Sequence, residues 1–324
     1  MEPDSLPSRR LAGELLALAY IAVVATIAAI SGAVYVMFPE LGALSHDVMT
    51  RPRGSWARAP ILLIVTPVAT AAIGTLVTRH LPYGYLSVML TVGGALIVLL
   101  ALRSPIAPAI SAGFLPLVLG VKSWWYPPAI VLSTAMLAAL SYMWRRQIGV
   151  SESHPDRSAY EVSAGEESLV QIAALMLFVL AGVLVVKLTN LRFVLFPPLV
   201  VIAFEMFVHT AHCPWAARAM RLPIVCLLSA SGGLVARHLG GVGPLSAIAS
   251  MIWGVLMLRV FDLHVPPALA VALLPQVMEA PTILYPLSVG VGTSLLSGVF
   301  VLYQQLCETR LKPVDSSSAA RKQV

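Results

Sequence analysis

Long apolar runs separated by short polar stretches cover most of the chain. Eight of these runs are long enough to cross about 30 Å of hydrocarbon as helices; they span residues 15–36, 59–77, 86–102, 127–144, 168–186, 222–239, 245–261 and 286–306. Four further apolar segments are short or interrupted by proline: 38–49, 105–121, 197–210 and 266–275. At membrane depth, backbone freed from helical hydrogen bonds must be buried in protein or line a cavity. We therefore predict re-entrant half-helices for these four segments.

The apolar pattern of the first half recurs in the second half. Three prolines recur 159 residues later: Pro108, Pro116 and Pro127 as Pro267, Pro275 and Pro286. Residues 38–41 and 74–81 recur at 196–199 and 232–239, an offset of 158 residues. Internal repeats of this kind decide the architecture. The sequence predicts an all-α, polytopic membrane helical bundle of two pseudo-symmetric repeats, each with about four transmembrane helices plus Pro-broken re-entrant segments.

Polar stretches divide the chain into five parts. They are a polar N-terminal tail (1–12), a first membrane repeat (13–146), a polar linker (147–167), a second membrane repeat (168–307) and a disordered C-terminal tail (308–324). Eight spans in parallel repeats place both tails and the linker on one side, and their arginines and lysines make that side the cytoplasmic face of the inner membrane. This topology leaves five arginines outside: Arg51, Arg53, Arg58, Arg218 and Arg221. If 105–121 crosses fully, each repeat instead has five spans and the repeats are inverted.

Composition supports a membrane protein and excludes other classes. Of 324 residues, 58% are hydrophobic and 11% are charged, and the mean hydropathy is +0.87. A soluble domain carries about 25% charged residues. The net charge of +6 forms no basic stripe with interleaved aromatics, so no nucleic-acid partner is expected. The three cysteines contain no C-x-x-C pair and indicate no disulfide framework.

No catalytic or cofactor motif is found, and we expect neither an enzyme nor a cofactor. The expected partners are the lipid bilayer and a small solute, with a homo-oligomer left open. Several aromatic residues near the ends of apolar runs are predicted to form interfacial belts; they are Tyr83, Tyr85, Trp124, Trp125, Tyr126 and Trp144.

Two prolines and two ionisable residues follow the seventh span. Asp262, His264, Pro266 and Pro267 stand together, and Pro108 is the counterpart of Pro267 in the first half. Paired broken segments at corresponding positions of two repeats indicate a transport site, although prolines also simply kink packed helices. An ionisable residue inside a membrane is a functional candidate by default. The alternative is that Asp262 and His264 lie at the interface with ordinary properties.

A second group of ionisable residues lies on the short segments. Asp47 and Glu205 occupy corresponding positions, and His209 follows Glu205 by one helical turn. Four residues of the second segment share a helical face, namely Glu205, His209, His212 and Cys213. All four are of residue types that bind zinc. A protonatable cluster lining a pore is the favoured hypothesis over a metal site, because the first half lacks the histidines. The two acids could carry protons or pair with arginines such as Arg103 or Arg259.

The repeated residues resemble the HPP family of integral membrane proteins. The resemblance rests on Phe196-Pro197-Pro198-Leu199 and His264-Val265-Pro266-Pro267-Ala268, with weaker copies at 38–42 and 105–109. Val265 separates the histidine from the proline pair, and the first copy has no histidine. The resemblance implies a four-span unit, here in tandem, and members of the family are linked to nitrite transport.

These patterns together favour a membrane transporter or channel for a small solute, with an inorganic anion such as nitrite as the first candidate. Its path would lie at the interface of the repeats and would involve Asp262, His264, Pro266, Pro267, Pro108, Asp47, Glu205 and His209. A non-transporting membrane scaffold or regulatory subunit is the alternative, and an intramembrane metal-binding protein is a third hypothesis.

Overall fold

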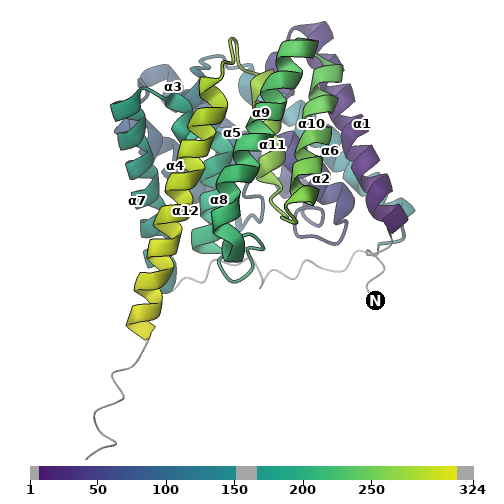
Figure 1. Ribbon diagram of the computed structural model, residues 1–324. Helices are drawn as coiled ribbons and strands as arrows, with labels where there is room; N and C mark the ends of the chain where they lie inside the picture. The colour runs from purple at the N-terminus through teal and green to yellow at the C-terminus, as the bar shows by residue number, and fades with distance from the viewer. Residues whose placement is uncertain (1–6, 151–165, 312–324) are drawn as a thin grey trace, which may run out of the picture.

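The computed structural model describes residues 7–150 and 166–311, and within them the chain forms only helices (Figure 1). Eight α-helices are long: α1 (Pro7–Ser31), α3 (Pro60–His80), α4 (Tyr85–Leu102), α6 (Tyr126–Gln147), α7 (Glu166–Thr189), α9 (Leu222–Gly240), α10 (Pro244–Val260) and α12 (Leu284–Leu311). Four are short: α2 (Glu40–Thr50), α5 (Ala109–Leu119), α8 (Pro197–Val208) and α11 (Pro267–Leu273). Short 3-10 turns join them: η2 (Val34–Val36), η4 (Arg192–Leu195), η5 (Ala216–Arg221) and η6 (Leu274–Gln276).

Seven of the described helices are long and apolar enough to cross a membrane, and α10 follows with 17 residues. The predicted all-α membrane bundle is confirmed at this level. Helix boundaries differ most at α1, which begins at Pro7 and ends at Ser31. The predicted polar tail 1–12 is therefore helical from Pro7, and Gly32, with φ of +70°, ends the first helix five residues before the predicted limit.

The polar linker and the C-terminal tail lie largely outside the described residues. Helix α6 runs to Gln147 and α7 begins at Glu166, so both ends of the predicted linker 147–167 are helical. Helix α12 continues to Leu311, into the stretch predicted as disordered from 308. Residues 1–6, 151–165 and 312–324 are outside the described part of the chain.

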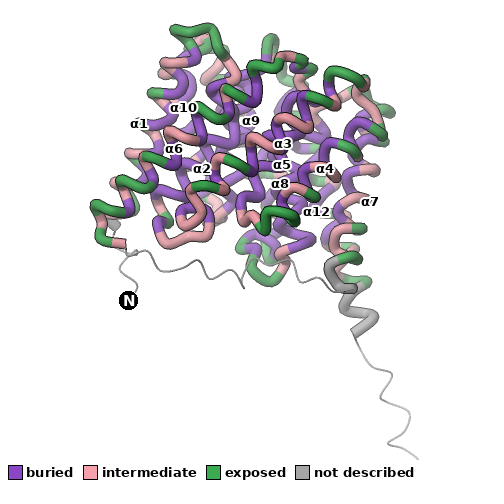
Figure 2. Tube along the Cα trace, turned by 180° about the vertical axis from the view of Figure 1, so that it is seen from behind, coloured by how far each residue is buried: buried purple, intermediate pink, exposed green. Residues whose placement is uncertain are grey.

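The four short helices form the core of the bundle. Every residue of α8 and α11 is buried, as are Glu40–Met49 of α2 and Ala109–Val118 of α5. The long helices pack around them and turn large apolar side chains such as Ile30 and Leu239 outward, where they are 84% and 85% exposed. Figure 2 shows this distribution, with burial concentrated in the middle of the bundle. An apolar exterior of this kind suits a lipid environment.

The segments containing α5, α2 and α11 connect opposite ends of the bundle, which differs from the re-entrant prediction. The segment containing α5 starts beside the beginning of α3, where Thr66 donates a hydrogen bond to Ser104 at 2.8 Å. It ends beside the last turn of α3, where Arg79 donates to the Lys122 carbonyl at 2.6 Å. Extended residues before and after the helix supply the length that its 11 residues lack.

The same holds for α2 and α11. The chain before α2 contacts the start of α6 through the ring pair of Tyr35 and Tyr126, and Met49 near the end of α2 accepts a hydrogen bond from Trp144 near the end of α6. Around α11, the Phe261 carbonyl contacts Arg221 at the start of α9. At the far end of this segment, Gln276 contacts the Ser246 hydroxyl at the start of α10.

The start of α1, the end of α12 and the loop 51–59 consequently share one end of the molecule, the lower end in Figure 1. The loop 51–59 belongs to this end, because the Ala57 carbonyl accepts a hydrogen bond from Arg145 in the last turn of α6. The predicted eight-span topology placed this loop at the opposite end of the molecule from the N-terminal tail. The apolar short helices, too short to span alone, gave no sequence signal of a full passage.

Matching contacts recur in the two halves. Tyr126 donates to the Ala112 carbonyl at 2.8 Å, and Tyr285 donates to the Val271 carbonyl at 2.6 Å. Donor and acceptor are both displaced by 159 residues. Tyr126, predicted to lie in an interfacial belt, is fully buried because of this contact.

Close packing between α9 and α11 gives a test of the fold. A Cβ added to Gly233 would lie 1.9 Å from the Ala272 carbonyl oxygen, whereas one added to Gly298 of α12 would meet nothing within 4 Å. We expect Gly233→Ala to destabilise the protein by about 1–3 kcal/mol through overpacking. Gly298→Ala should be neutral or slightly stabilising. Thermal unfolding of both purified variants in detergent checks this, and equal melting temperatures would contradict the packing of α11 on α9.

Candidate functional site

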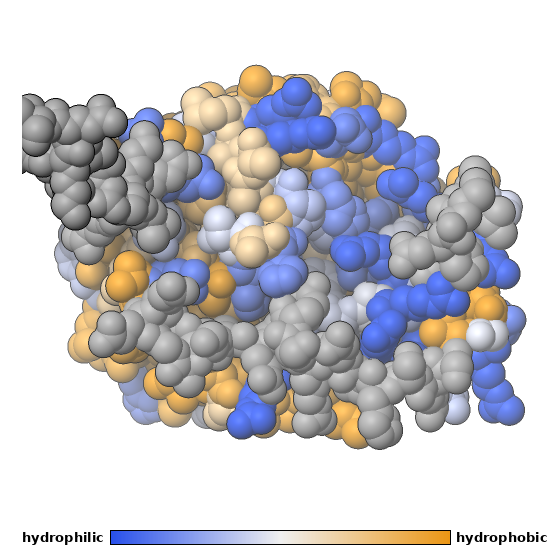
Figure 3. Space-filling view, turned by 90° about the horizontal axis from the view of Figure 1, so that it is seen from below, coloured by the Kyte–Doolittle hydropathy of each residue, from blue (hydrophilic) through white to orange (hydrophobic). Residues whose placement is uncertain are grey.

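A polar cavity of about 760 Å³ opens at the end of the bundle where α1 begins and α12 ends. Figure 3 shows this end from below, with hydrophilic side chains across the middle of the face. Both halves of the chain line the cavity: Arg10, His46, Asp47, Thr50, Arg51, Arg53, Gly54, Ser55, Trp56, Glu205, His212, Pro214, Trp215, His264 and Pro266. Four predicted site residues are among them: Asp47, Glu205, His264 and Pro266.

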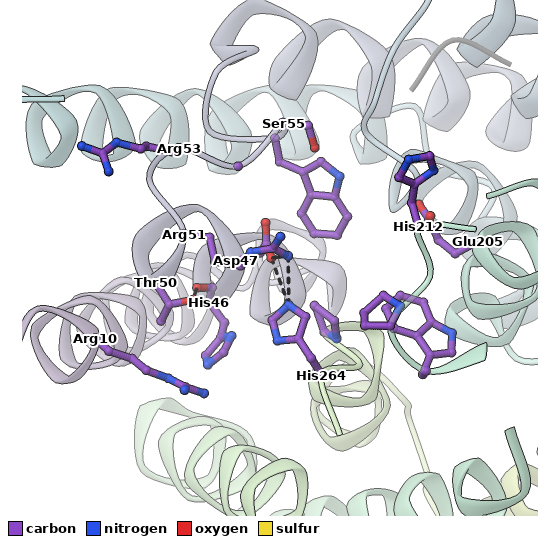
Figure 4. Close-up of a pocket in the computed structure, with 15 residues that line it drawn as sticks. Arg10, His46, Asp47, Thr50, Arg51, Arg53, Ser55, Glu205, His212 and His264 are labelled. Carbon is purple, nitrogen blue, oxygen red and sulfur yellow. Dashed lines mark hydrogen bonds and ion pairs between the residues drawn. The ribbon is translucent and has the colours of Figure 1, made fainter. Parts of the chain in front are cut away.

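One wall of the cavity joins the halves through a histidine. The His264 Nε2 atom lies 3.1 Å from an Arg51 nitrogen and 3.5 Å from an Asp47 carboxylate oxygen (Figure 4). Asp47 also pairs with Arg51, one turn further along α2, at 3.3 Å. Because an arginine can only donate, His264 accepts from Arg51 when its Nε2 carries no proton. Protonation of His264 would replace this bond by repulsion from Arg51 and attraction to Asp47.

The opposite wall comes from α8 and the loop after it. The His209 Nδ1 atom lies 3.0 Å from a Glu205 carboxylate oxygen. This pair occupies the positions that Asp47 and Arg51 hold in the first half, with an offset of 158. Figure 4 places Glu205 and His212 across the cavity from Asp47 and His264. Two carboxylates, each with a basic partner one turn away, therefore face the cavity from opposite sides.

A second cavity of about 350 Å³ adjoins the first. Arg10, His46 and His264 line both cavities. In the second, Glu14 of α1 pairs with Arg10 at 3.6 Å and with Arg259 of α10. The expected arginine partners of Asp47 and Glu205 were Arg103 or Arg259, but Arg259 pairs with Glu14 instead.

Asp262 lies at the outer edge of the second cavity. Its side chain is 88% exposed and pairs with Arg218 at 2.9 Å. The hydrogen bond and the charge of Arg218 hold the pKa of this carboxyl below its usual range. Its backbone is left-handed, with φ of +49°, as is that of Arg103 with φ of +46° at the corresponding turn of the first half. The position is consistent with an interfacial ion pair that closes the turn after α10.

The three prolines that were predicted as site residues stand at the starts of helices. Pro266 precedes α11, Pro267 is its first residue, and Pro108 precedes α5. Proline suits such positions because its missing N–H would have no partner in the first turn. Pro266 lines the main cavity, while Pro108 begins the corresponding helix of the first half outside that lining.

The arrangement gives no support to a metal site. Among the described residues, no group of three or more His, Cys, Asp or Glu side chains is placed to hold a metal ion. Burial, with a further contribution from Glu205, raises the pKa of the Cys213 thiol to about 12. Since the thiolate is the metal-binding form, this cysteine is poorly suited to coordination.

Sequence reasoning missed several residues of the site. Arg51 and Arg53 were predicted to lie at the opposite end, because the segment 38–49 was predicted to turn back. Arg10 falls in the predicted N-terminal tail, and neither Trp56 nor Trp215 was predicted as a site residue. Position 51 does carry a signal, because Asp47 and Arg51 are spaced as an ion pair on one helical face, as Glu205 and His209 are.

Three arginines and two carboxylates line the main cavity, together with three histidines. Even with the histidines neutral, this lining has a net positive charge, and its paired carboxylates limit that charge. It can attract a small anion and exchange protons through its imidazoles. No protein-family model matches the chain, and neither does any curated protein or solved structure compared with it.

The two aspartates allow a matched stability test. Asp47 is 5% exposed and its carboxylate contacts both Arg51 and His264, so Asp47→Asn should cost about 1–3 kcal/mol near neutral pH. Asp262→Asn should leave the melting temperature close to that of the wild type, because its pair with Arg218 is exposed. Thermal unfolding in detergent measures both, and a larger loss for Asp262→Asn would contradict these environments.

The same aspartate pair gives a prediction for pH. Because the folded-state pKa of Asp262 is lowered, its ion pair contributes fully above the ordinary aspartate pKa of about 4. The contribution is lost as the pH falls through the lower folded-state value. The difference in melting temperature between wild type and Asp262→Asn should therefore be constant between about pH 5 and about pH 8.

Proposed function

We propose that the chain is a multi-pass membrane transporter or channel for a small solute, with an inorganic anion such as nitrite as its substrate class. The observation that carries the proposal is the polar cavity, lined by both halves, inside a bundle whose exterior is apolar. Ionisable residues within a membrane domain are costly and commonly mark a solute or ion path. The cavity is far larger than a bare inorganic anion, so it would serve as a vestibule that admits a hydrated ion.

The two halves of the chain support a path between them. Transporters built from repeats bind substrate where the repeats meet. Here His264 of the second half contacts Asp47 and Arg51 of the first half. The recurrence of the tyrosine contacts at one offset, and the resemblance to the HPP family, favour a tandem duplication with parallel repeats.

The charges at the two ends favour one orientation. The end with the cavity carries most of the arginines of the described chain, including Arg51, Arg53 and Arg58, whose loop contacts the end of α6. Placing this end in the cytoplasm satisfies the positive-inside rule for the tails, the linker and this loop together. In the inner membrane, the vestibule would then face the cytoplasm.

Flux into proteoliposomes tests the proposal. Purified protein would be offered nitrite, nitrate, formate and chloride, with protein-free vesicles as the reference. We expect Arg51→Gln to lower anion flux at subsaturating concentration by about tenfold or more, as loss of a charged hydrogen bond of about 1.5–3 kcal/mol implies. Arg146→Gln, an exposed arginine at the same end that does not line the cavity, should keep wild-type flux.

The proline pair supplies a second variant for the same assay. Changing Pro266 and Pro267 to Leu removes the residues that begin α11 beside the cavity, and we expect flux to fall while the protein stays folded by gel filtration. Normal flux in this variant would count against a role for the α11 start. Absence of flux for every anion, from folded wild-type protein, would reject transport of these ions and favour a scaffold or regulatory subunit.

A further inference from the structure

A glutamate is enclosed in the centre of the bundle, away from both cavities. Glu40 stands in the first turn of α2 and has no exposed surface. Neither of its carboxylate oxygens makes a hydrogen bond within the described structure. An unpartnered ionised carboxylate is very costly away from water, so this environment favours the neutral acid. A residue of this kind persists in a packed core only at a cost in stability, which calls for a functional reason.

Among the described residues, polar groups but no cation act on the Glu40 carboxyl group. The Ser111 hydroxyl on α5 faces the carboxyl group as a weak hydrogen-bond partner, at a geometry too poor for a regular hydrogen bond. Tyr126 of α6 and Tyr285 of α12 lie near enough to interact electrostatically with Glu40. Their hydroxyls do not donate to Glu40, because each donates to a backbone carbonyl. Helix α11, which packs on α2, has no ionisable side chain, and the acid of α1, Glu14, is paired with arginines at the cavity end.

Helix geometry places Glu40 in line with the vestibule. Glu40 and Asp47 are seven residues apart, so they share one face of α2 and are separated by about 10 Å along its axis. Asp47 and His46 line the main cavity. His46 is 4% exposed and its Nδ1 atom has no hydrogen-bond partner in the described structure. Protonatable groups therefore stand at the cavity wall and again deeper in the core.

We propose that Glu40 is a proton-binding site between the two halves and that its proton is the coupling ion of transport. The proton comes from water in the vestibule, binds a carboxylate oxygen, and leaves as the carboxyl group meets water again. A neutral Glu40 can stay buried in the packed state that the structure shows. The charged form can exist only when the halves separate enough to hydrate it. The coupling part of this inference rests on the proposed transport function, whereas proton binding does not.

The first experiment measures coupling in proteoliposomes. Glu40→Gln keeps the side-chain volume and mimics the protonated acid permanently. We expect it to lose anion uptake driven by an inward proton gradient, down to the level of protein-free vesicles, yet to retain exchange of labelled for unlabelled anion. Glu40→Asp, which keeps the carboxyl group, should restore part of the gradient-driven uptake. Glu279→Gln, the same substitution at an exposed site, should behave as wild type.

Gradient-driven uptake at the wild-type level in Glu40→Gln would overturn the coupling role. Loss of exchange together with uptake, in a variant with wild-type melting temperature, would also overturn it, since that result marks a residue needed for the path itself. If Glu40→Gln does not fold, Glu40→Asp decides: its pH dependence of uptake must shift from that of wild type, and an unshifted profile would overturn the proposal.

Infrared difference spectroscopy tests proton binding without transport. Spectra of the protein in lipid nanodiscs at acidic and alkaline pH should contain the C=O band of a buried protonated carboxyl. The band should be absent from Glu40→Gln and present in Glu279→Gln. A band that survives in Glu40→Gln would overturn the site, even if the wild type transports anions. If the wild type moves no anion but the band is lost in Glu40→Gln, the transport proposal fails while the proton site stands.

Discussion

The need to satisfy backbone hydrogen bonds away from water shapes this whole structure. Short helices with extended ends leave carbonyl and N–H groups that lipid cannot satisfy. All four short helices are accordingly buried inside the long ones. Tyrosines supply part of the missing hydrogen bonding, as when Tyr126 and Tyr285 donate to carbonyls of α5 and α11. Only because long helices surround them can the short ones carry polar residues at depth.

This burial also explains where the cavity forms. The ends of α2 and α8 and the start of α11 meet at one end of the bundle, with polar loops between them. The long helices enclose the last turns of α2 and α8, so the buried side chains of Asp47 and Glu205 line this polar space. Each acid has a basic partner one turn later on the same chain segment. The cross-contact from His264 then ties the second half to the first, so relative movement of the halves would act on this group directly.

Apolar periodicity predicted nearly all of the helices, because long apolar runs in this chain have few alternatives to spanning helices. It failed for the path of the short ones. Residues 109–119 are too few to cross as a helix alone, and only contacts such as Arg79 with Lys122 show that the chain continues to the far end. The same error at the segment 38–49, which contains α2, moved Arg51 and Arg53 to the opposite end of the bundle. It also hid their place beside Asp47 and His264, two residues that the sequence did single out.

The two halves differ most where chemistry is expected. Glu40 corresponds to Pro198, His46 to Phe204 and His264 to Pro105, so each of these ionisable groups occurs once. The acids at Asp47 and Glu205, by contrast, recur together with their helical partners. A duplication that keeps the scaffold but leaves single protonatable groups makes the two halves chemically unequal. This inequality confines the buried protonatable groups Glu40 and His46 to the first half of the chain. The buried glutamate and the cross-contact at His264 are therefore the positions where this fold departs from symmetry with a chemical consequence.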